Sequence, residues 1–425
     1  MATLAFHFQN SGKTLRKRFG ALSVRNYRHY FYAQSISLTG TNLQQLAISW
    51  LMYSLTRSST WVGWLGVATM VPAFFLSPLG GYYADKLERK KLLIAAEIAC
   101  ALQAMVLFIL VRNNWIQAWH VILAGVFNSC ILAFEMGARH AFSKDLVGQQ
   151  YIASAVSINT MTFNLSRIIG PLVGAATIAA VGLENCFLIN SLSYSVVLFV
   201  LITMRLPKKA IAKVEADSIK VITSEIILGF KYILNDIFLI RCFAAASIGS
   251  IFGWAIPVIF PQLVVDVLHA GPSMVAYLTG AMSLGAILGS LTIVRDRSKI
   301  EIERILLQLM ALSAVALIVL GFSKSIVSAL VLLAIFGFCL ITIFPIVNTA
   351  IQTFCDDRMR GRVLGNYMMV FTGSAPLGGL IIGKLGDLYG PLAALRWFGL
   401  LMVLIVFVAF VFSRGRLRSM PQQPL

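Results

Sequence analysis

The recurrence of apolar stretches about twenty residues long is the feature that most constrains this chain. They follow one another from residue 30 to residue 412. A hydrocarbon layer about 30 Å thick requires about 20 apolar residues per helix. Charged residues make up only 12% of the 425 residues, against about 25% in soluble proteins. The sequence therefore predicts an all-α integral membrane protein and excludes a soluble core.

Twelve spans are expected, separated after the sixth by one long hydrophilic segment. The expected spans cover residues 30–54, 60–83, 92–111, 119–140, 152–181, 186–205, 241–266, 273–294, 304–322, 326–350, 363–385 and 391–412. The predicted organisation is a cytoplasmic N-terminus (1–29), an N-terminal six-helix bundle (30–205), a cytoplasmic linker (206–240), a C-terminal six-helix bundle (241–412) and a cytoplasmic C-terminus (413–425).

The linker has its own helical pattern. Apolar residues recur in it at helical spacing, at Ile219, Ile222, Ile226, Phe230, Ile233 and Ile237. Charged residues stand between them, which is typical of an amphipathic helix on a membrane surface. We expect this helix to link the two halves, with a regulatory docking site as the alternative.

The net charge of +18 is distributed very unevenly. Only Arg57, Arg112 and Lys324 fall in loops predicted on the outer side. Three more basic residues lie within spans: Arg167, Lys384 and Arg396. All the others fall in segments on the opposite side, so the positive-inside rule places both termini in the cytoplasm and the chain in the inner (plasma) membrane. This distribution explains the charge without a nucleic-acid partner.

Sites for enzymatic or metal chemistry are not indicated. The six cysteines form no CxxC pair, so we expect neither a disulfide framework nor a metal site. The sequence contains no phosphate-binding loop motif and no convergent set of nucleophile and base. We therefore expect no cofactor and no enzyme, and a proton gradient as the energy source.

The stretch GGYYADKLERKKLL, residues 80–93, places charges between two apolar spans. Gly81 permits a neighbouring helix to approach closely. Asp85 offers a carboxylate that can bind the N-terminus of a helix. The basic residues that follow are Lys86, Arg89, Lys90 and Lys91. Such contacts can break and reform, which is what a cytoplasmic gate requires.

This loop resembles the signature loop of the major facilitator superfamily, roughly G-x-x-x-D-[RK]-x-G-[RK]-[RK]. Glu88 replaces the usual second glycine, as in the branch of macrolide-efflux and enterobactin-exporter-like proteins. Three other stretches are similar to that branch: TGTNLQQLAISW, NLSRIIGPLVG and QTFCDDRMRGRV. The resemblance implies two six-helix bundles that alternate access to a central cavity.

The resemblance also implies roles for particular residues. Asp85 would contact the start of the eleventh span near Arg360 and Arg362 when the carrier opens outward; the alternative is a static brace. Gly170, Pro171 and Gly174 match a fifth-span motif associated with antiporters. Independently of the family, glycine at these positions predicts close helix packing.

Candidate coupling residues are the acids inside spans, Glu97 and Glu135. Glu135 precedes Arg139 by four residues, the favourable order for an ion pair on a helix. We expect these three residues to exchange protons, with a static ion pair near the membrane surface as the alternative.

Candidate substrate residues are polar or aromatic side chains inside spans. Arg167 lies about 22 Å into its span by helical rise, where a cation is costly unless it faces protein or water. Asn164 lies one turn earlier on the same face. In the first span, Asn42, Gln45 and Trp50 are candidates for lining the cavity; bonding to neighbouring helices is the alternative. Near the outer side, Lys384 is expected to pair with Asp387.

These features together predict a proton antiporter that exports small amphiphilic organic compounds, either siderophore-like or drug-like. The expected partners are a small-molecule substrate and membrane lipid, with no nucleic acid, and the chain is expected to act as a monomer. The alternatives are a nutrient or metal-chelate uptake carrier of the same fold and a membrane sensor or enzyme without transport activity.

Overall fold

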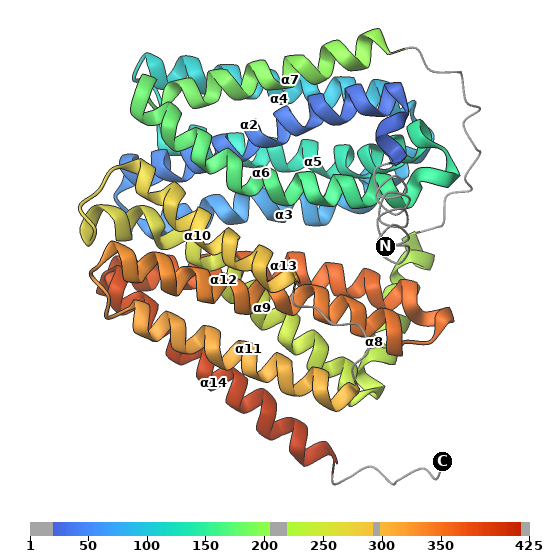
Figure 1. Cartoon of the computed structure of the whole chain (residues 1–425), viewed down its shortest axis with the longest axis vertical. Coiled ribbons are helices and arrows are strands. Elements are labelled where there is room, and N and C mark those ends of the chain that lie inside the picture. The colour runs from blue at the N-terminus through green and yellow to red at the C-terminus, as the bar shows by residue number, and fades with distance from the viewer. Residues whose placement is uncertain (1–19, 205–218, 292–297, 418–425) are drawn as a thin grey trace, which may run out of the picture. The chain divides into compact units, whose positions relative to one another are not determined.

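The computed structural model describes residues 20–204, 219–291 and 298–417 (Figure 1). The regular elements in these ranges are all helices. The helices before the linker are η1 (Gly20–Ser23), α2 (Arg25–Thr56), α3 (Ser59–Lys86), α4 (Arg89–Arg112), α5 (Ala118–Val147), η2 (Gln149–Tyr151), α6 (Ile152–Val181) and α7 (Glu184–Thr203). Those from the linker onward are α8 (Ile219–Asn235), α9 (Ile237–Asp266), α10 (Pro272–Leu291), α11 (Lys299–Leu320), α12 (Ile326–Phe354), α13 (Asp357–Tyr389) and α14 (Pro391–Leu417).

This order confirms the expected architecture of six long helices, a linker helix and six more long helices. Several helices extend beyond the predicted spans, because polar residues at their ends continue the helix past the apolar run. The clearest case is α13, which begins at Asp357 although the apolar span was expected from residue 363.

Eleven helices in the described ranges are long and apolar enough to cross a membrane. The remaining expected span, residues 30–54, lies in α2, which does not meet this criterion. Polar side chains such as Gln34, Thr41 and Gln44 interrupt its apolar sequence. Among the twelve long helices that the structure describes, α2 is therefore the one whose sequence is too polar to meet the criterion.

The chain divides into two compact units by its contacts. Unit 1 comprises residues 1–48 and 75–215, and unit 2 comprises residues 49–74 and 216–425. The division therefore falls inside α2 and α3, and the segment between residues 49 and 74 packs with the C-terminal helices.

Within each unit, glycine allows helices to cross closely. In unit 1, a Cβ atom on Gly80 of α3 would lie 2.0 Å from the carbonyl oxygen of Ala133 on α5. In unit 2, α10 and α12 cross at two glycines: a Cβ on Gly285 would lie 1.9 Å from the oxygen of Ala334, and one on Gly337 would lie 2.0 Å from that of Met282. Any larger residue at these positions would separate the helices.

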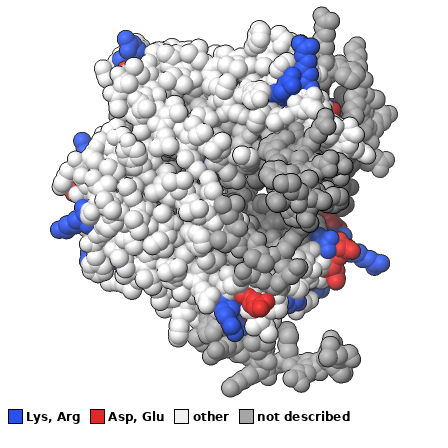
Figure 2. All heavy atoms as spheres, in the orientation of Figure 1, with Lys and Arg blue, Asp and Glu red and all other residues white. Residues whose placement is uncertain are grey.

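The surface is mostly uncharged. On the face shown in Figure 2 the described charged side chains are few, and uncharged residues cover most of the area. Large apolar side chains such as Phe75, Phe199 and Val327 are about 70% exposed. Exposed apolar patches of this extent are unfavourable in water, whereas lipid solvates them.

The linker helix α8 packs against the start of α13. Glu225 forms an ion pair with Arg362 through two contacts, and one of them, from Arg362 Nη2 to Glu225 Oε1, is 2.8 Å long. Asn366 donates a hydrogen bond of 3.0 Å to the carbonyl oxygen of Ile226. The opposite face exposes Ile227 and Leu234. The linker therefore does contain a helix, but this helix ends at Asn235, so Ile237 of the expected apolar face belongs to α9.

Candidate coupling and gate residues

A buried ion pair lies inside unit 1. Glu135 and Arg139 on α5 form the i, i+4 pair that their spacing predicts. The Glu135 side chain is only 7% exposed and that of Arg139 is 22% exposed. Low exposure strengthens the attraction between the two charges, and it also makes the loss of either partner costly.

Glu97 on α4 adds a second carboxylate to this pair. It is 2% exposed, and Glu135 and Arg139 both lie within electrostatic range of it. Its Oε2 atom has no hydrogen-bond partner among the described residues. Two carboxylates and one guanidinium therefore lie within electrostatic range of one another, and a single proton on either acid makes the buried cluster neutral. The structure brings the three predicted coupling residues together.

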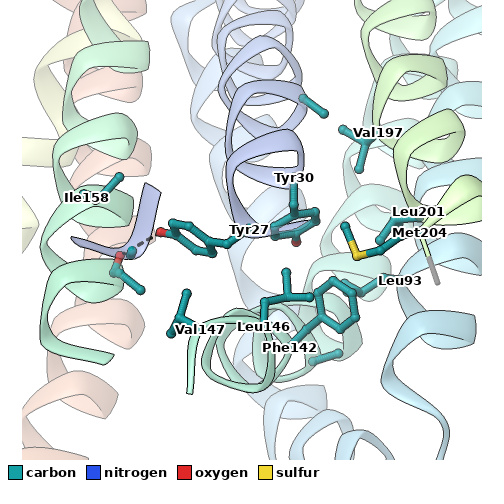
Figure 3. Close-up of a cluster of buried hydrophobic side chains, with 14 residues drawn as sticks. Tyr27, Tyr30, Leu93, Phe142, Leu146, Val147, Ile158, Val197, Leu201 and Met204 are labelled. Carbon is teal, nitrogen blue, oxygen red and sulfur yellow. Dashed lines mark hydrogen bonds between the residues drawn. The ribbon is translucent and has the colours of Figure 1, made fainter. Parts of the chain in front are cut away.

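Tyr30 completes the cluster from α2. Its ring packs edge-on against Phe142, with 5.3 Å between the ring centroids, and Figure 3 shows it beside Leu93 and Phe142. The Tyr30 hydroxyl is buried and has no partner among the described residues. One turn earlier, the Tyr27 hydroxyl donates a hydrogen bond of 3.2 Å to the carbonyl oxygen of Ala155 on α6 (Figure 3).

A ladder of buried side chains, not anticipated from the sequence, continues from this cluster. Gln44 on α2 donates to Gln103 on α4 over 3.3 Å and accepts a 2.8 Å bond from Asn190 on α7. Asn190 also donates to the Tyr194 hydroxyl, which lies 3.1 Å from the Thr41 hydroxyl. The available signal was the 3, 4 spacing of polar residues on one face of α2. Their partners, however, lie more than fifty residues away in sequence.

The Gly170, Pro171 and Gly174 motif does pack a helix closely, as predicted. A Cβ atom on Gly170 would lie 2.5 Å from Cβ of Asn42 on α2. Gly174 faces Leu43 of the same helix, and Pro171 is buried inside α6. This motif therefore fixes α6 against α2.

The candidate substrate residues do not form one cluster. Asn42 is half-buried and donates hydrogen bonds to Leu38 O (2.8 Å) and Ser166 Oγ (3.3 Å), so it ties α2 to α6. Asn164 is exposed and Arg167 is partly exposed on α6, and Gln45 is exposed on α2. Trp50 is half-buried and belongs to unit 2.

The basic side of the predicted gate is held within unit 1. Arg89 forms a 2.5 Å ion pair with Asp145 at the end of α5. Lys90 donates a 2.8 Å hydrogen bond to the carbonyl oxygen of Met204, after α7. Lys86 is exposed at the end of α3. Gly81 and Asp85 belong to α3, and the side chain of Asp85 lies outside what the structure describes.

The predicted partners of Asp85 are bound within unit 2. Arg360 pairs with Asp357 at 2.5 Å, and Arg362 pairs with Glu225 on the linker helix. The contact with Glu225 was not expected from the sequence. Any latch between Asp85 and Arg362 would have to compete with it.

At the other end of the helices the predicted pair of Lys384 and Asp387 is wrong. Asp387 instead accepts hydrogen bonds from the start of α3: 2.5 Å from Ser58 Oγ, 2.6 Å from Ser59 N and 3.0 Å from Thr60 N. These donors include backbone N–H groups that have no partner inside the helix. They also carry the positive end of the helix dipole, which attracts the carboxylate.

Comparison with known proteins accounts for this architecture. Residues 17–424 match the model of the major facilitator family MFS_3, described as "Transmembrane secretion effector". The enterobactin exporter EntS of Shigella flexneri is 24% identical, covering 93% of this chain and 94% of its own. The multidrug efflux pump Tap of Mycolicibacterium fortuitum is also 24% identical, covering 91% of this chain and 95% of its own.

Solved structures agree in fold. A bacterial homologue of the human lysosomal transporter Spinster has a TM-score of 0.70 at 13% identity and covers 94% of this chain and 99% of its own. The nucleoside transporter NupG has a TM-score of 0.70 at 16% identity, with coverage of 91% and 98%. The chain therefore belongs to the transmembrane secretion effector family of the major facilitator superfamily, and it is a multi-pass membrane transporter rather than an enzyme.

Proposed function

We propose that this transporter exports small amphiphilic organic compounds, siderophore-like or drug-like, across the inner (plasma) membrane in exchange for protons. It works as a monomer by alternating access, with both termini in the cytoplasm and lipid around its exposed apolar surface. Small molecules are the substrates, and no nucleic acid takes part.

The observation that carries the proposal is the buried cluster of Glu97, Glu135 and Arg139. Two acids and one base form a set whose net charge changes between −1 and 0 when one proton binds. Burial disfavours the charged state, so release of that proton requires water or a substrate to reach the cluster. Such a dependence couples proton release to substrate binding.

The direction and substrate class rest on the relatives. An enterobactin exporter and a multidrug efflux pump each align over more than nine-tenths of this chain. Both names describe export of an organic molecule, which favours export over uptake.

The gate proposal rests on the basic loop between α3 and α4. Here Arg89 and Lys90 are held by their own unit, and Arg362 by the linker helix. We infer that closure of the cytoplasmic side exchanges the Glu225 contact of Arg362 for a contact with Asp85.

Transport into proteoliposomes tests the function. Purified protein is reconstituted, a pH gradient of either sign is imposed, and uptake of enterobactin and of the dye ethidium is measured against protein-free vesicles. We expect accumulation only when protons run opposite to the substrate. Accumulation in the same direction as protons would replace export with uptake, and no movement of either probe under either gradient would reject the proposal.

A deletion strain separates the two substrate classes. Under iron limitation, retention of an iron chelator in cells that lack the gene, reversed by complementation, supports siderophore export. An unchanged chelator together with faster ethidium accumulation supports drug efflux.

A further inference from the structure

We propose that the interior of unit 1 contains a hydrated proton route that follows one face of α2 from Tyr30 to Gln44 and serves Glu97. The inference rests on the proposed function, because a proton route has a purpose only in a proton-coupled carrier. It adds a path inside the helix bundle to the coupling residues already described.

One wall of the route is the face of α2 that carries polar residues at intervals of four and three. These residues are Tyr30, Gln34, Ser37, Thr41 and Gln44. This spacing places them on the same side of a helix. Four of them are at most 7% exposed, and Thr41 is half-buried. By helical rise the stripe is about 21 Å long, most of a hydrocarbon core about 30 Å thick.

The opposite wall is formed by α4 and α7. On α4, Glu97, Cys100 and Gln103 follow one another at intervals of three residues. On α7, Asn190 and Tyr194 lie one turn apart. Cys100 interacts with both Glu97 and Tyr194, so it lies between the charged cluster and the hydrogen-bonded ladder. The two walls thus enclose a continuous polar strip.

The strip contains polar atoms that protein does not satisfy. Of the buried atoms that lack a hydrogen-bond partner in the described residues, five lie in the strip: Tyr30 Oη, Gln34 Oε1, Gln34 Nε2, Glu97 Oε2 and Gln103 Nε2. Each such atom costs free energy in an apolar interior. A group of them along one seam is the arrangement that bound water satisfies. Water is therefore the expected occupant.

Water and the hydroxyl groups of the strip can pass a proton to Glu97. A water in the strip gives its proton to the Glu97 carboxylate, so one O–H bond breaks and one forms. The loss is refilled along water and the hydroxyls of Tyr194 and Thr41, which both donate and accept. The amides of Gln34, Gln44, Gln103 and Asn190 hold the waters in place.

Other charged and titratable groups set the affinity of Glu97 for that proton. They are Glu135 and Arg139 on α5, Tyr30 on α2 and Cys100 on α4.

Two substitutions at separate points of the strip test the route. Gln34→Leu removes both unsatisfied amide atoms, and Thr41→Val removes the hydroxyl next to Tyr194. Thr177→Val is the matched control, because Thr177 and Thr41 make the same bond to a carbonyl four residues earlier (2.8 and 2.9 Å). Thr177 differs in its position, because it lies on α6, outside the strip. Uptake of ethidium and enterobactin into proteoliposomes is measured with a pH gradient and, separately, as substrate exchange without a gradient.

We expect Gln34→Leu and Thr41→Val to lose at least tenfold of gradient-driven uptake while exchange stays within twofold of wild type. Thr177→Val should leave both activities within twofold. If both strip variants keep gradient-driven uptake while Glu97→Gln loses it, the route is wrong and the proposed function stands. A wild type that does not respond to the gradient rejects both.

Radiolytic footprinting tests the water directly, without transport. Bound water is converted to hydroxyl radicals in place, and oxidation of buried cysteines is quantified by mass spectrometry. Cys100, 4% exposed, lies in the strip, whereas Cys186 and Cys242 are 0% exposed elsewhere. We expect Cys100 to be oxidised at least fivefold faster than either control. Equal rates would overturn the hydrated route.

Discussion

The first long helices of the two halves, α2 and α9, both bury polar side chains, but these side chains differ in their hydrogen-bond partners. Buried polar side chains on α2 include Gln34, whose amide atoms lack partners among the described residues. On α9 the buried serine and glutamine are satisfied: Ser250 donates 2.5 Å to Phe371 O, and Gln262 donates 3.0 Å to Gly386 O and accepts 2.7 Å from Ser59 Oγ.

The other buried atoms without hydrogen-bond partners also differ between the two units. In unit 1, Glu97 and Tyr30 have unsatisfied atoms deep in the bundle. In the described part of unit 2, the unsatisfied atoms are Nε of Arg241 and Arg360, whose guanidinium groups already hold a carboxylate. Unsatisfied polarity reduces stability, so its concentration in one unit indicates a function there. Unit 2 uses its polar groups to fix helices.

The largest expected effect is the loss of transport on substitution of Glu97, the buried acid of unit 1. Glu97→Gln should reduce gradient-driven uptake of ethidium or enterobactin about 100-fold, because the amide cannot take up a proton. Glu184→Gln is the control, since Glu184 lies 3.7 Å from Arg112 in a more exposed pair. Equal uptake by the Glu97→Gln variant and wild type would remove Glu97 from coupling.

Removal of the buried cation should have the largest effect on stability. Arg139→Met leaves Glu97 and Glu135 buried without a positive charge, and loss of one partner of a buried pair costs about 3–5 kcal/mol. Thermal unfolding in detergent should show a large decrease in the melting temperature. Glu135→Gln should cost less, because the opposite charges of Glu97 and Arg139 then remain within electrostatic range of each other. The reverse order would contradict the shared cluster.

Matched glutamine substitutions in the two units should differ in how much they destabilise the protein. Gln262→Leu should destabilise the protein by about 1–3 kcal/mol, because Ser59 Oγ and Gly386 O lose their partner. Gln34→Leu should change the free energy of unfolding by less than about 1 kcal/mol, because no protein group loses a hydrogen-bond partner. Chemical unfolding of both variants in the same detergent measures the difference. Destabilisation of both by similar amounts would end the contrast between the units.

The smallest expected effect concerns the contact of Asp387 with α3. Asp387→Ala should lower the free energy of unfolding by about 0.5–2 kcal/mol, as loss of a helix cap does. Asp357→Ala, at an exposed acid of the same helix, should have no measurable effect. An equal response in both variants would mean that the contact contributes nothing to stability.

The elements that the sequence predicts well depend on local patterns. Runs of apolar residues predict the long helices, and spacing along one helix predicts the pair of Glu135 and Arg139. Glycine next to proline predicts the close packing of α6 on α2 through Gly170. Each of these signals lies within a few residues, so no knowledge of the tertiary structure is needed.

The remaining contacts depend on partners that are distant in sequence. The ladder joins Gln44 to Asn190, and the linker helix joins Glu225 to Arg362. Asp387 was expected to pair with Lys384 because that pair is local. The N-terminus of α3, more than three hundred residues away, proved the stronger partner because its oriented N–H groups are fixed, whereas a lysine side chain must be ordered.

Proton release on substrate binding tests the central claim most directly. Purified transporter in a weakly buffered detergent solution is mixed with enterobactin or ethidium, and the change in pH is recorded while binding is measured in parallel. We expect wild type to release about one proton per bound molecule and Glu97→Gln to bind without release. Binding to wild type without release, or equal release from the Glu97→Gln variant, would contradict proton exchange at Glu97.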